Sequence, residues 1–147
     1  MNVWAPIMHG GQEVLLRRMR VVLADDNDAI LEHAARLLAP DFDIVGTLAD
    51  GESVLSSFEQ SRPDVVVLDI SMPNMNGIEV ARRLFEMGHQ PKIVFLTVHE
   101  EKEFVCAAFG VGGAGYVIKS RLDSDLPNAL NAVLAGRIYV SPSLQQA

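Results

Sequence analysis

Apolar runs that suit buried strands alternate five times along the chain with segments whose apolar residues recur at helical spacing. The predicted strands cover residues 19–24, 42–48, 64–68, 92–96 and 115–118. A helix is expected after each strand, starting near residues 28, 50, 78, 100 and 124 and ending by residues 40, 62, 88, 110 and 136. Asp28 and Asp50 are suited to cap the first two helices. Pro127 is expected in the first turn of the fifth helix, where a missing backbone N–H is tolerated.

Near-continuous apolar strands separated by helices favour an α/β fold with a parallel sheet that is covered on both faces. Right-handed crossovers leave few topologies for five such strands. The second strand ends in residues 47–49 (TLA), which contain no acidic or basic side chain. The other four strands end in acidic, hydroxyl or ammonium residues, which we call the chemically capable residues. We therefore predict a doubly wound, flavodoxin-like five-stranded sheet of order 2-1-3-4-5, with its switch point between strands one and three.

Those chemically capable residues are Asp25 and Asp26 after the first strand, Asp69 after the third, Thr97 after the fourth and Lys119 after the fifth. Because the carboxyl ends of parallel strands lie at one edge of the sheet, we expect them to form one pocket. Carboxylates are ligands for a hard metal ion such as Mg²⁺, and a lysine suits a phosphate group. The pattern predicts a pocket for magnesium and a phosphoryl group.

Composition narrows the class of protein. The 147 residues fit a single domain with a substantial core. The net charge of −7 makes direct binding to a phosphate backbone unfavourable. A single cysteine, Cys106, is consistent with the reducing cytoplasm, and no apolar stretch reaches the ~20 residues that a membrane span needs.

The ends of the chain read differently from its centre. Residues 1–17 lack the pattern of a signal peptide and are expected to be a flexible extension. Residues 18–140 are the expected domain. The polar residues 141–147 (SPSLQQA) are expected to begin a linker or to form a tail.

Four motifs in the expected order resemble the receiver domain of two-component response regulators. They are residues 23–26 (LADD), 67–77 (VLDISMPNMNG), 95–97 (FLT) and 115–120 (GYVIKS). Residues 113–119 (GAGYVIK) and 136–142 (GRIYVSP) are similar to the LuxR/NarL-type subfamily, whose receivers precede a helix-turn-helix DNA-binding domain. The chain stops where the interdomain linker would begin, which favours a receiver separated from such a domain over a stand-alone receiver.

The resemblance implies a role for each pocket residue. Asp69 would be the phosphoacceptor. Asp26, Asp69 and the backbone carbonyl of Ser71 would ligate Mg²⁺ directly, and Asp25 would act through a bound water. Lys119 would hold a phosphoryl oxygen.

The resemblance also implies how the signal leaves the pocket. Thr97 would donate its hydroxyl to the arriving phosphoryl group, and Tyr116 would turn inward in response. The phosphoryl donor would be a sensor histidine kinase, and phosphorylation would promote a homodimer. Control of transcription would run through the absent DNA-binding domain, with no membrane contact and no conventional enzyme activity.

Two residues and the function of the chain each have an alternative interpretation. Tyr116 could be an ordinary core aromatic residue. His99, near the pocket mouth, could tune dephosphorylation together with Ser71, or it could be an exposed loop histidine. A Mg²⁺-dependent phosphohydrolase with an aspartyl nucleophile is a competing function. Many such enzymes carry a second aspartate where this chain has Ser71, and the lack of a glycine-rich loop disfavours a nucleotide- or flavin-binding module.

Overall fold

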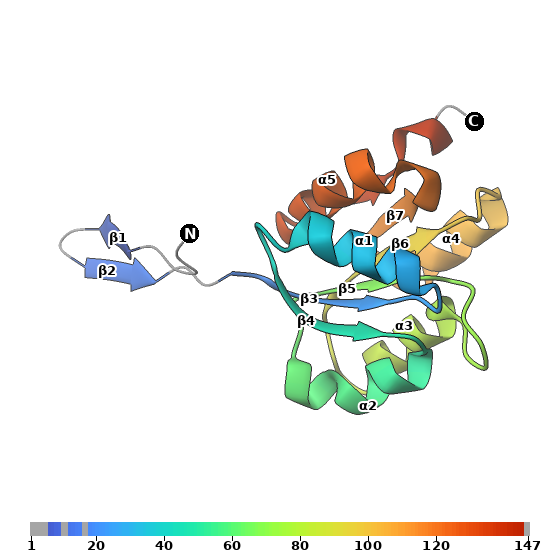
Figure 1. Cartoon of the computed structure of the whole chain (residues 1–147), viewed down its shortest axis with the longest axis horizontal. Coiled ribbons are helices and arrows are strands. Elements are labelled where there is room, and N and C mark those ends of the chain that lie inside the picture. Colours follow the sequence, from blue (N-terminus) through green and yellow to red (C-terminus); the bar gives the residue numbers. More distant parts are fainter. Residues whose placement is uncertain (1–5, 10–11, 16–17, 146–147) are drawn as a thin grey trace.

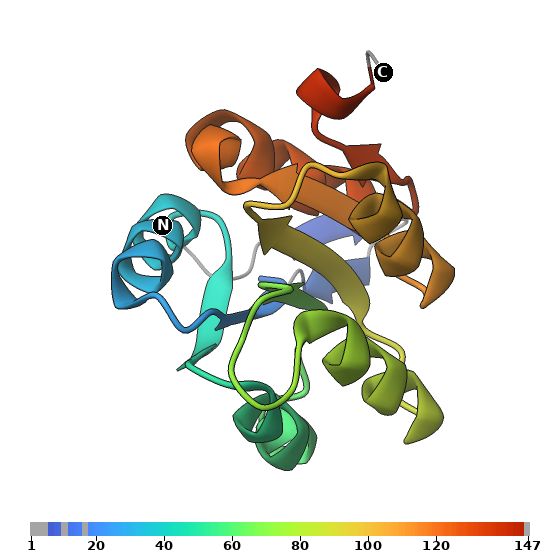
Figure 2. The same cartoon turned by 90° about the vertical axis from the view of Figure 1, so that its right-hand side faces the viewer.

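The computed structural model describes residues 6–9, 12–15 and 18–145, and its centre is a six-stranded parallel sheet. The spatial order is β4-β3-β5-β6-β7-β8, and every neighbouring pair runs parallel. The strands are β3 (Arg20–Ala24), β4 (Asp43–Leu48), β5 (Val65–Leu68), β6 (Lys92–Thr97), β7 (Gly115–Ile118) and β8 (Tyr139–Val140). The order of the first five is the predicted one (Figures 1 and 2).

The prediction of five strands in this sheet was wrong by one. Strand β8 contains two residues and pairs with Gly115 and Tyr116 of β7. Two residues are too few to produce a recognisable alternation in the sequence. Gly136, with a φ of 82°, ends the preceding helix in the left-handed region and lets the chain turn back to the sheet.

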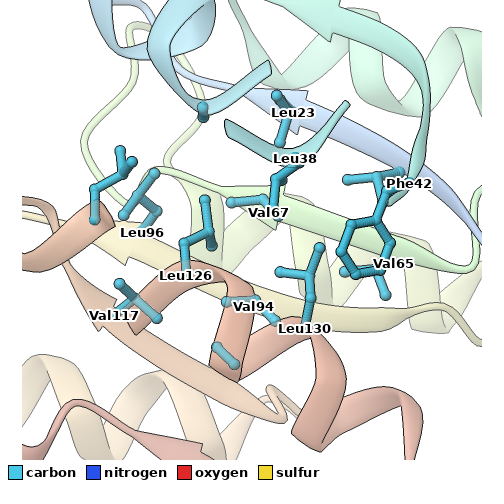
Figure 3. Close-up of a cluster of buried hydrophobic side chains, with 14 of the residues drawn as sticks. Leu23, Leu38, Phe42, Val65, Val67, Val94, Leu96, Val117, Leu126 and Leu130 are labelled. Atoms are coloured by element: carbon cyan, nitrogen blue, oxygen red, sulfur yellow. The ribbon is translucent and has the colours of Figure 1, made fainter. Parts of the chain in front are cut away.

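Five α-helices cover the two faces of the sheet. They are α1 (Asp28–Leu38), α2 (Gly51–Ser61), α3 (Gly77–Glu86), α4 (Lys102–Gly110) and α5 (Leu122–Leu134). Helices α1 and α5 pack on one face, and Figure 3 shows that core around Leu23, Val67 and Leu126. Helices α2, α3 and α4 pack on the other face. Successive strand residues such as Val21 and Val22 therefore enter opposite cores.

The first residues of three helices can be compared with their predictions. Asn27, not Asp28, caps α1, because its side chain accepts hydrogen bonds from the next backbone N–H groups. Asp50 caps α2 as predicted, accepting from Ser53 N at 2.8 Å. Helix α5 begins at Leu122, after the 3₁₀ turn η1 (Lys119–Arg121), so Pro127 lies inside the helix rather than in its first turn.

Both predicted ends contain residues with regular secondary structure. Strands β1 (Pro6–His9) and β2 (Gln12–Leu15) pair antiparallel as a separate two-stranded sheet. The rest of the predicted extension, residues 1–5, 10–11 and 16–17, lies outside the described residues. Ser141, the first residue of the predicted tail, is fully buried, and η2 (Pro142–Leu144) follows it. Within the described ranges, no helix is both long and apolar enough to cross a membrane.

Candidate functional site

The four chemically capable strand ends meet at one edge of the sheet. Strands β3 and β5 end at paired residues, Ala24 beside Leu68, and β6 and β7 end at another pair, Thr97 beside Ile118. Leu68 also lies beside Phe95, two residues before the end of β6. The residues that follow these ends are therefore adjacent in space. Asp69 N donates to Ala24 O at 2.9 Å, which places the acid of β5 directly beside the acids that follow β3.

Three carboxylates form the centre of the site. Asp25, Asp26 and Asp69 each offer an oxygen, and these oxygens all lie within 4.8 Å of one another. Asp25 and Asp69 are 2% and 3% exposed, whereas Asp26 is open to solvent. We call these three residues the acidic cluster. Its hard oxygen donors and its open side fit Mg²⁺, which binds through a few carboxylates and keeps several waters.

Lys119 is the cationic partner of the acidic cluster. Its Nζ lies 2.7 Å from Asp25 Oδ2 and donates to Asp69 Oδ2 at 3.1 Å. Burial alone would lower the pKa of the ammonium, but hydrogen bonds to Asp25 and Asp69 outweigh burial and raise that pKa. Lys119 therefore stays charged. Its Nζ lies where it would contact an oxyanion attached to Asp69.

The environment of Asp69 disfavours its negative charge. Burial raises the pKa of this carboxyl, and the nearby charge of Asp25 raises it further. The hydrogen bond from Lys119 and the N–H of Ser71, which donates to Asp69 Oδ1 at 3.2 Å, only partly oppose these effects. The acidic cluster therefore lacks positive charge, which a divalent cation would supply.

Gly77 is a residue of the site that the sequence reasoning did not single out. Its N–H donates to Ile70 O at 2.8 Å, and a Cβ at this position would overlap the backbone carbonyl of Asp69. Asn76 caps the helix that starts at Gly77 by accepting from Glu79 N. The Asn76-Gly77 pair was visible in the sequence, but a turn and a close backbone approach share this signal.

His99 connects several of the predicted residues. Its N–H donates to Thr97 Oγ1 at 3.3 Å, and its carbonyl accepts from the Tyr116 hydroxyl at 2.8 Å. Its Nε2 shares a hydrogen bond of 2.6 Å with Ser71 Oγ, and its ring stacks on Phe104 at 4.1 Å. The side chain of His99 is 24% exposed and therefore partly buried, and its role in dephosphorylation stays a prediction.

Tyr116 lies inward in this structure. Its side chain is fully buried between the sheet and the α2–α3–α4 face, and its hydroxyl has a backbone partner. Burial raises the pKa of the phenol, and the nearby charge of Glu101 raises it further, so the hydroxyl remains a donor. The same geometry suits a core aromatic residue and a switch residue, and its movement stays a prediction.

Comparison with known proteins gives a consistent picture. Residues 21–131 match the family model described as the response regulator receiver domain. The chain is 32% identical over 136 residues to the transcriptional regulatory protein DegU of Brevibacillus brevis, covering 90% of this chain and 57% of that protein. It is 35% identical over 131 residues to the response regulator GacA of Pseudomonas viridiflava, covering 87% of this chain and 61% of that protein.

A solved structure agrees with these sequence relatives. The crystal structure of a LuxR-family two-component response regulator from Aurantimonas sp. SI85-9A1 superposes with a TM-score of 0.83 at 33% identity. The match covers 88% of this chain and 94% of that chain. This chain thus spans about three fifths of the length of the two curated relatives and nearly all of the solved one.

Proposed function

Because this chain belongs to the family of response regulator receiver domains, we propose that it is a switch controlled by phosphorylation of Asp69. One observation carries the proposal. The Asp69 carboxylate lies 3.1 Å from Lys119 Nζ and close to the carboxylates of the other two acids in the acidic cluster. This arrangement supports the proposal, because a carboxylate suited to act as a nucleophile, an ammonium group and further oxygen donors suited to a metal ion lie at one sheet edge.

The proposed chemistry is transfer from a phosphohistidine of a sensor histidine kinase. A carboxylate oxygen of Asp69 attacks phosphorus, the new O–P bond forms, and the P–N bond breaks with its electron pair returning to the imidazole. Asp26, Asp69 and the Ser71 carbonyl would hold Mg²⁺, with Asp25 acting through water. The bound ion would supply positive charge to the phosphoryl oxygens. Lys119 neutralises one phosphoryl oxygen as the charge on it develops.

Thr97 and Tyr116 would carry the switch. The Thr97 oxygen accepts from the His99 N–H, which leaves the Thr97 O–H as a donor for a phosphoryl oxygen. Recruiting Thr97 would move the His99 backbone, to which the Tyr116 hydroxyl donates. Phosphorylation then biases the equilibrium by the extra contacts that Thr97 and Lys119 make in the active state.

We propose that Ser71 and His99 tune the lifetime of the acyl phosphate. Their shared hydrogen bond joins the loop after β5 to the loop after β6, beside the carboxylate that would carry the phosphoryl group. Water must reach phosphorus past this pair to release inorganic phosphate and regenerate the Asp69 carboxylate. Position 71 is a serine, so no acid lies two residues after Asp69, which disfavours the alternative of a phosphohydrolase with an aspartyl nucleophile.

The proposed output is control of transcription in the cytoplasm. DegU is named a transcriptional regulatory protein, and the solved relative is a LuxR-family response regulator. In this proposal DNA is contacted through a separate C-terminal domain, and phosphorylation promotes a homodimer. A receiver that acts alone through protein contacts is the alternative output.

Intact-mass measurement after incubation with acetyl phosphate and Mg²⁺ tests the proposed function. One added phosphoryl group is expected on the native chain, and none on Asp69→Asn or in the absence of Mg²⁺. Beryllofluoride, which mimics an acyl phosphate, is then expected to bind the native chain with Mg²⁺. A native chain that gains no mass and binds no beryllofluoride would overturn the proposal.

A further inference from the structure

A second buried carboxylate lies outside the site just described. Among the described residues, the buried polar side chains are Asp25, Asp69, Thr97, Asp125 and Ser141. The first three belong to the proposed phosphorylation site. Asp125 and Ser141, 3% and 0% exposed, come from α5 and from the residue after β8, and they bond to each other.

Asp125 is fully supplied with donors. Its Oδ2 accepts from Ser141 Oγ at 2.9 Å and from Arg121 Nε at 3.3 Å, and its Oδ1 accepts from Ser124 Oγ at 3.1 Å. A buried carboxylate is stable when it is both paired with a cation and hydrogen-bonded. Burial and the charge of Asp125 also raise the pKa of the Tyr139 phenol, which places Tyr139 beside the same carboxylate.

Ser141 extends the sheet where β8 ends. Its N–H donates to Tyr116 O at 2.9 Å, and its hydroxyl oxygen accepts from Ile118 N at 3.1 Å. The hydroxyl thus replaces the strand carbonyl that a longer β8 would present to Ile118. Residues 139–145, called here the C-terminal segment, also pack Tyr139 against one core and Leu144 against the other.

These contacts surround the turn that carries Lys119. Ser141 holds Ile118, the residue before Lys119, and Asp125 holds Arg121 at the end of the same turn, η1. One carboxylate therefore fixes both flanks of the turn, directly on one side and through the Ser141 hydroxyl on the other. Strand β7, to which the C-terminal segment pairs, also contains Tyr116.

We propose that Asp125 and Ser141 form a clasp that positions Lys119 and makes binding of a phosphoryl-like anion and docking of the C-terminal segment favour each other. The inference rests on the proposed function, because the anion is the one that Lys119 and Mg²⁺ would hold on Asp69. Docking of the segment fixes the turn before the anion arrives, so the anion loses less binding free energy to ordering that turn. By linkage, anion binding strengthens docking of the segment by the same factor as docking strengthens anion binding.

Amide hydrogen exchange on the full chain, with and without beryllofluoride and Mg²⁺, tests this coupling. In the native chain, beryllofluoride is expected to slow exchange of peptides covering residues 139–145 by about threefold to tenfold. Ser141→Ala removes the acceptor of Ile118 N and a donor to Asp125, so exchange at these positions is expected to rise about tenfold without ligand. Beryllofluoride should then bind about threefold to tenfold more weakly and no longer protect the segment.

Three further variants separate positioning from general stability. Ser57→Ala removes a half-buried serine hydroxyl that donates to Ser53 O at 2.6 Å within α2, and it should leave beryllofluoride affinity and segment protection unchanged. Ser141→Thr keeps a hydroxyl and is expected to restore both properties. Asp125→Asn should repeat the Ser141→Ala result, and these two variants decide the test if Ser141→Ala fails to fold.

The outcomes are distinguishable. Native affinity and native protection in Ser141→Ala and Asp125→Asn would overturn the clasp, as would an equal loss in Ser57→Ala. Failure of the native chain to bind beryllofluoride would refute the coupling, and if the chain also gains no mass from acetyl phosphate it would refute the proposed function. Unchanged exchange in ligand-free Ser141→Ala would refute the clasp even if the proposed function holds.

Discussion

Replacing Asp69 by asparagine should stabilise the protein in the absence of Mg²⁺. With carboxylate oxygens within 4.8 Å of each other, the repulsion between Asp69 and the buried Asp25 costs at least about 3.5 kcal/mol at an effective dielectric constant of about 20, or about 0.9 in water. The Lys119 pair at 3.1 Å offsets about 5.4 or about 1.3 kcal/mol in the same two limits. Burial of the charged carboxyl, the largest cause of the raised pKa of Asp69, adds to the repulsion from Asp25, and together they outweigh this attraction, so the variant should gain about 1 kcal/mol.

The pH dependence of that gain has a definite sign. Burial and Asp25 raise the folded-state pKa of Asp69 above its ordinary value of 3.8. The favourable contribution of the native carboxyl is therefore fully present below 3.8 and is lost as pH rises through the raised folded pKa. The advantage of Asp69→Asn should be largest near neutral pH and should shrink as the solution is acidified.

Urea unfolding measured by circular dichroism, from about pH 4 to about pH 8 and with or without Mg²⁺, checks this reasoning. Mg²⁺ should stabilise the native chain more than the variant, because Asp69→Asn removes one of the proposed metal ligands. Asp41→Asn, an exposed acid, is the control and should shift stability by less than about 0.5 kcal/mol. A variant less stable than the native chain at neutral pH without Mg²⁺, or a gain independent of pH, would refute the electrostatic account.

Three other perturbations test the site. Lys119→Met leaves the acidic cluster without its cation and should cost about 3 kcal/mol in urea unfolding, partly restored by Mg²⁺. Gly77→Ala drives a methyl group into the backbone carbonyl of Asp69, so unfolding should be easier by about 2 kcal/mol and acetyl phosphate labelling slower. Gly110→Ala, with open space at the same atom, should be neutral in both assays. His99→Ala and Ser71→Ala should change the acyl-phosphate lifetime by similar factors and without additivity, because each removes the same hydrogen bond; additive effects would exclude that route.

The sequence predicted the arrangement of the sheet because its signals are long. Four of the five predicted strands carry runs of apolar residues that are buried on both faces, and each ends in a chemically distinct residue. The order follows from which strand lacks such an end. That Asp25, Asp69 and Lys119 would lie close together was predictable for the same reason, since the register of the strands brings them to one edge.

Short or tertiary features were not predictable in the same way. Asn27 and Asp28 are both good capping residues, and the backbone conformation chose Asn27. The turn η1 moved the start of α5 to Leu122, which nothing near Pro127 indicated. The contacts of His99 with Ser71 depend on two loops that are distant in sequence, so residue type alone left its role open.

The two buried carboxylate sites on either side of Lys119 differ in how well their charges are compensated, and that difference separates chemistry from positioning. Asp125 has a cation and two hydroxyl donors, so it needs no ligand and is suited to fix a turn. The acidic cluster holds three carboxylates against one ammonium, and the raised pKa of Asp69 reflects that shortage of positive charge. A divalent cation bound to the acidic cluster would supply the missing positive charge. An anion bound beside that cation would contact the Lys119 ammonium, which the contacts of Asp125 help to position.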